Sequence, residues 1–345
     1  SGQMAAIGAF DALSFYSVIA GWTIDYYFRS VTVGFTGITT ARTVAALEEL
    51  MFSPGRMMLS QMIFIGLTAI TVAAGIRRGL EKVLRWLTPT LFVLLILLLA
   101  YAVLAGDIRA AAEFLFVPDF SKLSAETVLL AVGQAFFSLG IGLGVLLTIG
   151  AYMDQDSSIL RASLIVAGAD AGVALLAGLA IFPIVFANGL SPAEGPGLIF
   201  MTLPVAFGGM PGGAILAPLF FSLMAIAALT SAITILETIV STIEDYSDMS
   251  RHKIVLPVTF MLWVAGLGTV FSFSDLQNFH PLGFIPAFAD RNIFESLDYI
   301  VSNWMMPAGG VLIALLAGWG LAQSATREEL RLPDGTVYRA WHALV

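Results

Sequence analysis

The feature that most constrains the fold is a series of predominantly apolar stretches, each long enough to cross a lipid bilayer. A helix needs about 20 apolar residues to span the hydrocarbon core. Hydrophobic residues make up 58% of the 345-residue chain and charged residues 12%, against roughly 45–50% and 25% in soluble domains. We therefore predict one all-α transmembrane domain with about eight spans, at residues 4–28, 56–75, 83–105, 125–153, 160–188, 214–246, 254–273 and 292–321.

The segments between the spans predict the orientation of the chain. The linker with Arg77, Arg78, Lys82 and Arg85 is rich in basic residues, so it is expected in the cytoplasm. Residues 30–55, which include the helical pattern ARTVAALEEL, and residues 106–123 are expected to be polar connections. Residues 189–213 then lie outside, and their glycines, prolines and apolar patches predict an extracellular capping loop.

Several classes of function are disfavoured by composition. The chain has no cysteine, so disulfides and thiolate metal sites are excluded, and its three histidines lie far apart in sequence. The net charge of −8 gives no indication of nucleic-acid binding. The chain carries no P-loop, zinc motif or nucleophile elbow, and we expect no enzyme activity.

The span at 125–153 contains the sequence VGQAFFSLGIGLGVLL, which predicts a broken helix near 139–144. Gly140, Gly142 and Gly144 weaken a helix because each loses much backbone entropy on ordering. The polar residues Gln134 and Ser138 precede them. Interrupted helices are tolerated in membranes where they line a cavity, and many transporters bind ions and substrate there. Close helix packing through small residues is the alternative.

Four polar residues inside other spans are further candidates. Asp170 costs about 2.5–3.5 kcal/mol to insert, so it is either a hydrogen-bonded carboxyl between helices or a site for a cation or proton. Thr230 and Ser231 either bond back to the preceding turn or join backbone carbonyls around a sodium ion. Tyr16 is either a core tyrosine or a hydroxyl that points into a central cavity.

In combination, several segments resemble the neurotransmitter:sodium symporter family, specifically its prokaryotic amino-acid branch with the LeuT-type inverted-repeat bundle. The resemblance implies that the chain is a partial one that covers the third to tenth helices of that fold and lacks the first two. The segments that carry it are FYSVIAGW, GIRRGLEK, VGQAFFSLGIGLGVLLTIGAYM, AGLAIFP, GPGLIFMTLPVAF, ALTSAITILE and IEDYSDMSR.

The resemblance also implies roles for individual residues. The substrate-binding positions are Tyr16, Phe137, Ser138, Gly140, Leu143, Ser231 and Ile235. Two sodium sites are implied, the first with Ser138 and Asp170, the second with the Ala227 carbonyl, Thr230 and Ser231. Asp170 stands where most members have Asn, and an acid there supplies the negative charge that chloride provides in the animal transporters. The gating positions are Gln134 and Asp298 outside, Asp245 inside, and Gly79 and Pro89, where local unwinding opens a path for sodium.

These features lead us to expect a chloride-independent, sodium-coupled amino-acid symporter of the bacterial inner membrane that works by alternating access. Its partners are an amino acid, sodium ions and lipid, with no nucleic acid. Gly140, Leu143 and Ala12 are smaller or less aromatic than is usual in the family, which favours hydrophobic or aromatic substrates. The alternatives are proton coupling through Asp170 and a non-transporting amino-acid sensor or accessory subunit.

Overall fold

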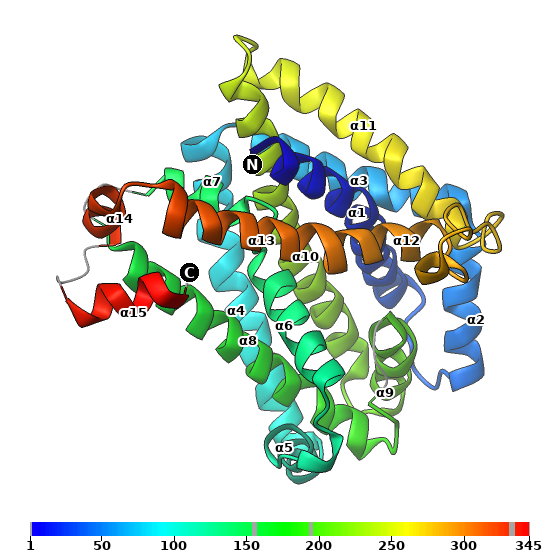
Figure 1. The fold of residues 1–345 in the computed structure, drawn as a ribbon. Helices are drawn as coiled ribbons and strands as arrows, with labels where there is room; N and C mark the ends of the chain where they lie inside the picture. Colours follow the sequence, from blue (N-terminus) through cyan, green and yellow to red (C-terminus); the bar gives the residue numbers. More distant parts are fainter. Residues whose placement is uncertain (1, 154–156, 193–195, 331–334, 345) are drawn as a thin grey trace.

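The computed structural model describes residues 2–153, 157–192, 196–330 and 335–344, and it is built from helices (Figure 1). Seven helical stretches of the described residues are long and apolar enough to cross a membrane. They are α1 (Gly2–Thr32), α3 (Pro54–Ala73), α4 (Glu81–Ala105), α8 (Ile159–Ala187), α10 (Gly213–Asp245), α11 (Arg251–Ser272) and a continuous stretch formed by α12 (Ile293–Ile300), η5 (Val301–Met305), α13 (Met306–Leu315) and η6 (Leu316–Gly320).

The expected broken helix is present as two short helices, α6 (Ala125–Leu139) and α7 (Val145–Ala151). Gly140, Gly142 and Gly144 between them all have positive φ, at 64°, 94° and 76°. Side chains with a β-carbon rarely adopt this backbone region, so the glycines are what allows the turn. The amide of Ile141 donates to the Phe136 carbonyl at 2.9 Å and closes the end of α6.

The remaining helical segments are shorter. They are α2 (Thr40–Met51), η1 (Ile76–Leu80), α5 (Ile108–Phe116), η2 (Phe120–Lys122), η3 (Leu198–Thr202), α9 (Leu203–Gly209), η4 (Pro286–Phe288), α14 (Gln323–Leu330) and α15 (Thr336–Leu344). Helix α5 lies within residues 106–123, where the sequence predicted a polar connection and no helix was expected. Asp107 caps this helix by accepting from the Ala110 amide at 3.0 Å, and Ala111 on its inner side is fully buried.

Helix α10 runs through the middle of the bundle, and α1, α3, α4 and α11 pack around it (Figure 1). Ala232, Ile233 and Leu236 of α10 are fully buried. They belong to one apolar cluster with α1, α3 and α11, while the earlier half of α10 contributes Phe220 and Phe221 to a second cluster. Burial of this apolar surface, at roughly 25 cal/mol per Å², orients α10 within the fold.

Helices α1, α3 and α11 meet at a polar joint inside the first cluster. Gln61 of α3 is fully buried and donates to the Ser17 hydroxyl of α1 at 3.1 Å. Gly21 of α1 and Gly266 of α11 lie against Gln61 so closely that a β-carbon at either position would overlap it. A buried amide needs its hydrogen bond, so this joint sets the position of α1 against its neighbours.

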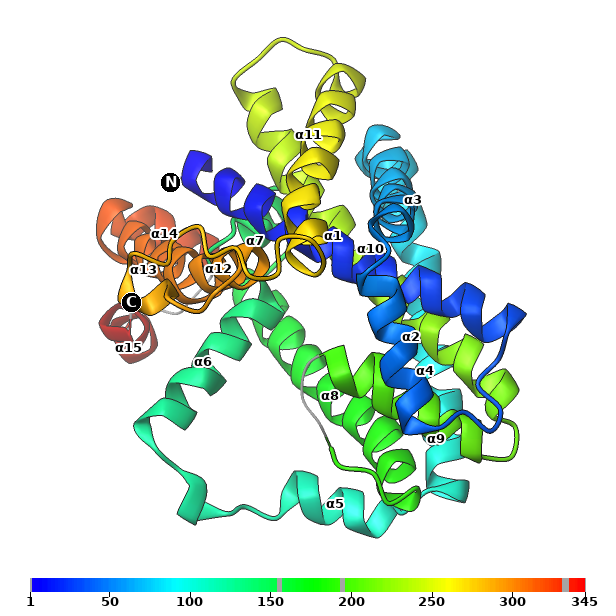
Figure 2. The same ribbon diagram turned by 90° about the vertical axis from the view of Figure 1, so that its right-hand side faces the viewer.

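The predicted capping loop contains η3 and α9, and its residues 193–195 lie outside the described residues. Phe200, Leu203 and Phe207 of this segment are buried in the core. The Phe200 ring contacts the rings of Trp22 and Tyr26 on α1, with centroids 5.6 and 4.9 Å apart. Figure 2 shows α9 near α2 and α8, and the segment packs against α2, α8 and α10.

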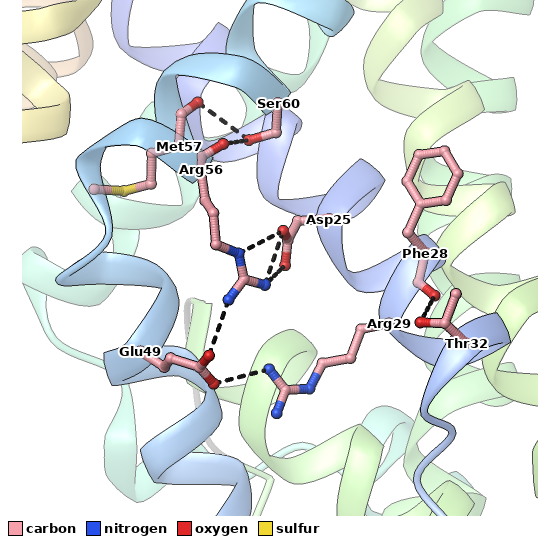
Figure 3. Close-up of polar contacts among 8 residues, drawn as sticks. All are labelled: Asp25, Phe28, Arg29, Thr32, Glu49, Arg56, Met57 and Ser60. Atoms are coloured by element: carbon pink, nitrogen blue, oxygen red, sulfur yellow. Dashed lines mark hydrogen bonds and ion pairs between the residues drawn. The ribbon is translucent and has the colours of Figure 1, made fainter.

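Helix α2 is attached to α1 and α3 by a chain of alternating charges (Figure 3). Arg56 at the start of α3 donates to both carboxylate oxygens of Asp25 on α1, with Nη2–Oδ2 at 2.9 Å. Glu49 of α2 accepts from Arg56 at 3.2 Å and from Arg29 at 3.4 Å. The Asp25 carboxylate is only 14% exposed, so its pair with Arg56 is less screened by solvent than the pairs of Glu49.

We predict that Arg56→Gln lowers the stability of the protein by about 1–2 kcal/mol, because it leaves Asp25 without its charged partner. The measurement is the midpoint of thermal unfolding in detergent. The control is Glu49→Gln, which removes only exposed pairs and should change the midpoint little. Equal midpoints for the two variants would contradict the importance of the Asp25–Arg56 pair.

Candidate functional site

All seven residues predicted to bind substrate line one cavity of about 560 Å³. Tyr16 comes from α1, Phe137 and Ser138 from α6, Gly140 and Leu143 from the break, and Ser231 and Ile235 from α10. Phe137 lies at the rim with 40% of its surface exposed. The fold thus brings residues from three parts of the sequence together, and their role in binding stays a prediction.

The rest of this cavity is mainly apolar. Ala12, Phe15, Val145 and Met224 also line it. Leu143 is 4% exposed because it packs with Ala12, Phe15 and Met306 in a small apolar cluster. Polar groups are confined to a few positions, as is usual where a small molecule with an apolar side chain is bound.

The structure joins the two residues predicted for the first sodium site. The Ser138 hydroxyl of α6 donates to Asp170 Oδ1 of α8 at 2.6 Å. Ser138 is exposed and Asp170 is partly exposed at the same face. A hydroxyl and a carboxylate are oxygen ligands suited to a hard cation. No group of three or more His, Cys, Asp or Glu side chains gathers within the described ranges.

The predicted second sodium site lies within one turn of α10. The Thr230 and Ser231 hydroxyls both donate to the Ala227 carbonyl, at 2.8 and 3.4 Å. This is the back-bonding arrangement common for Ser and Thr in membrane helices, and it also gathers the three predicted oxygen ligands. The Tyr16 hydroxyl donates to the Ala228 carbonyl at 3.4 Å, next to this turn. Tyr16 and Ser231 line an adjoining cavity of about 220 Å³ as well.

Two of the predicted gating residues meet at a further cavity of about 500 Å³. Gln134 and Asp298 line it together with Phe137, which also lines the central cavity. Asp298 accepts from the Ser302 hydroxyl one turn later, at 3.2 Å. The rim of the central cavity therefore adjoins the predicted outer gate.

The other gating residues lie at the opposite end. Asp245 is exposed as the last residue of α10. Gly79 lies in the π-helical turn η1, where a β-carbon would overlap the Thr71 carbonyl oxygen. Pro89 lies inside the continuous helix α4, where it cannot donate a backbone hydrogen bond.

A buried ionic cluster surrounds the same end of α10. Glu237 is fully buried and pairs with Arg251, at the start of α11, and with the Tyr152 hydroxyl at 2.8 Å. Arg251 also donates to Glu244 and to the Val72 carbonyl of α3, both at 2.8 Å. The cluster therefore connects the segment after α7 to α3, α10 and α11.

Sequence reasoning missed several of these residues. Thr234 lines the central cavity one turn after Ser231, and helical periodicity would have placed it there. No local sequence pattern identifies Tyr152 and Arg251 as partners of Glu237. The pairing of Asp25 with Arg56 likewise depends on how α1 and α3 pack.

The chain resembles proteins whose family is known. The sodium:neurotransmitter symporter family model matches residues 38–275. The sodium-dependent transporter YhdH of Bacillus subtilis is 34% identical and the match covers 96% of this chain and 72% of that protein. A sodium-dependent transporter of Haemophilus influenzae is 30% identical, and the match covers 99% of this chain and 74% of that protein. The crystal structure of MhsT in complex with L-phenylalanine matches with a TM-score of 0.88 at 36% identity, and covers 99% of this chain and 76% of that one.

The fold and these matches define a multi-pass membrane transporter with a LeuT-type bundle, and not an enzyme. The chain belongs to the sodium:neurotransmitter symporter family, in its prokaryotic branch. The predictions of an all-α membrane protein, of its fold and of its family are confirmed.

We predict that Arg251→Met destabilises the protein by about 3–5 kcal/mol, because it leaves the buried Glu237 carboxylate without its counter-charge. The double variant Glu237→Gln with Arg251→Met should recover much of this loss, since it removes the orphaned charge. The measurement is thermal unfolding in detergent. A double variant as unstable as Arg251→Met alone would show that the charge of Glu237 is not the cause.

Proposed function

We propose that this protein carries an amino acid with a hydrophobic or aromatic side chain across the bacterial inner membrane, coupled to sodium and independent of chloride. The observation that carries the proposal is the hydrogen bond between Ser138 and Asp170, with Ser138 on the wall of the central cavity. It places an acid beside a broken helix, where ion and substrate would meet.

The first sodium ion would bind at Ser138 and Asp170. Asp170 follows an apolar part of α8, where a carboxylate is costly unless it serves a cation or a partner. Because Asp170 is itself an anion, the bound sodium would need no chloride to balance its charge. The second ion would bind where Thr230, Ser231 and the Ala227 carbonyl converge.

The amino acid would bind in the central cavity. The Tyr16 hydroxyl offers a hydrogen bond to a carboxylate, and the apolar walls formed by Ala12, Phe15 and Leu143 suit an apolar side chain. The L-phenylalanine bound to MhsT supports the aromatic class. Phe137 at the rim would close over the substrate.

Transport would proceed by alternating access across the membrane-spanning helices, with the basic linker 77–82 in the cytoplasm and the capping loop 189–213 outside. The cavity lined by Gln134 and Asp298 would form the outer route. Asp245 and the Glu237–Arg251 cluster would close the inner route, and unwinding between Gly79 and Pro89 would release the inner sodium.

The proposal is tested by amino-acid uptake into liposomes under a sodium gradient. We predict that the wild-type protein transports in chloride-free buffer. Asp170→Asn should lose about tenfold or more of this uptake, which corresponds to ~1.4 kcal/mol, because the variant lacks the negative charge. Added chloride should restore the uptake. The control is Asp275→Asn, an exposed acid in the connection after α11. Unchanged chloride-free uptake by Asp170→Asn would refute its role, and wild-type uptake driven by a pH gradient without sodium would indicate proton coupling instead.

For the second ion site we predict that Ser231→Ala raises the sodium concentration for half-maximal uptake by about tenfold, because one of few oxygen ligands is lost. The control is Thr242→Ala on the same helix, whose hydroxyl bonds back to the Thr238 carbonyl at 2.7 Å. If both variants keep the sodium dependence of the wild type, Ser231 is not a ligand.

A further inference from the structure

We propose that Gly309 and Gly310 of α13 are positioning residues for the broken helix, and that they hold Ser138 and Phe137 in place through direct contact with the break. The inference rests on the proposed function of those two residues. It concerns a helix that carries no predicted ligand of substrate or ion.

The contact joins two backbones with no side chain between them. A β-carbon at Gly309 would overlap the carbonyl oxygen of Gly142, and a β-carbon at Gly142 would overlap the carbonyl oxygen of Met306. Gly142, Met306 and Gly309 are all buried. The break therefore lies directly against the first turn of α13.

Gly309 has no conformational reason to be glycine. It lies inside α13, and its φ is not among the positive values of the glycines. Glycine within a helix is unfavourable relative to alanine. The close approach of Gly142 is a sufficient physical reason for glycine at this position.

The neighbouring glycine holds the end of α6. A β-carbon at Gly310 would overlap the edge of the Phe136 ring and lie 3.4 Å from Ile141 Cγ2. Phe136 directly precedes Phe137 and Ser138, and its carbonyl accepts the bond that closes α6. The two glycines therefore contact the break and the last turn before it.

The same helix leads to the predicted outer gate. Met306 follows the π-helical turn Val301–Met305, and this turn follows α12, which carries Asp298. Single π-helical turns inside longer helices often occur at functional sites. A displacement at Asp298 would thus reach the break through one short, continuous segment.

The test compares the same Gly→Ala change at three places. Gly309→Ala and Gly310→Ala crowd the break, whereas at Gly66 of α3 a β-carbon meets no heavy atom of the described chain within 4 Å. The first readout is hydrogen exchange of the amides of residues 136–145 in the absence of ion and substrate. The second is the sodium concentration for half-maximal uptake.

We expect Gly309→Ala to speed exchange in this segment and to raise the half-saturating sodium concentration by about tenfold, since ~1 Å of misplacement can cost a factor on the order of 100 in activity. Gly310→Ala should act in the same direction but less, because the ring edge of Phe136 can move, and Gly66→Ala should match the wild type. If Gly309→Ala behaves like Gly66→Ala in both readouts, the proposal is wrong.

If Gly309→Ala does not fold, the Gly310→Ala variant tests the proposal instead. Faster hydrogen exchange of residues 136–145 in that variant supports the proposal, and unchanged exchange overturns it. Hydrogen exchange is independent of transport. A wild-type protein that shows no sodium-dependent uptake would therefore refute the proposed function, while the exchange comparison would still decide whether these glycines hold the break.

Discussion

A peptide group inside a bilayer finds no water, so each interruption of a membrane helix must be supported by the protein itself. The break between α6 and α7 meets this constraint with three glycines of positive φ, a bond from Ile141 to Phe136, and a direct contact with α13. The positions of Phe137, Ser138 and Leu143 on the cavity wall follow from that turn. The packing of the neighbouring helix α13 against the turn supports it.

Helix α10 provides the fixed side of the same cavity. Its fully buried residues anchor it among α1, α3 and α11, while the Thr230 and Ser231 hydroxyls of one turn share the Ala227 carbonyl. Oxygen groups thus lie on a continuous, well-packed central helix on one side and on a broken helix on the other.

The sequence predicted much of this arrangement because apolar runs and glycines indicate spans and helix breaks from neighbouring residues alone. The all-α membrane class and the break were predicted from such patterns, and the break is where Gly140 to Gly144 indicated it. The family and its LeuT-type fold were predicted from the resemblance of several segments taken together. The contacts of Arg56 with Asp25 and of Arg251 with Glu237 were not predicted, because they depend on which helices pack together. Helix α5 was missed because nine residues with a mixed composition resemble a polar connection.

The alternating charges of Asp25, Arg56, Glu49 and Arg29 have an electrostatic consequence. Asp25 lies two residues beyond Thr23, which lines the cavity next to Tyr16. Two acids and two bases in close pairs cancel each other's field within a few ångströms in a screened solvent. This end of α1 therefore presents four charged side chains but almost no net charge to its surroundings.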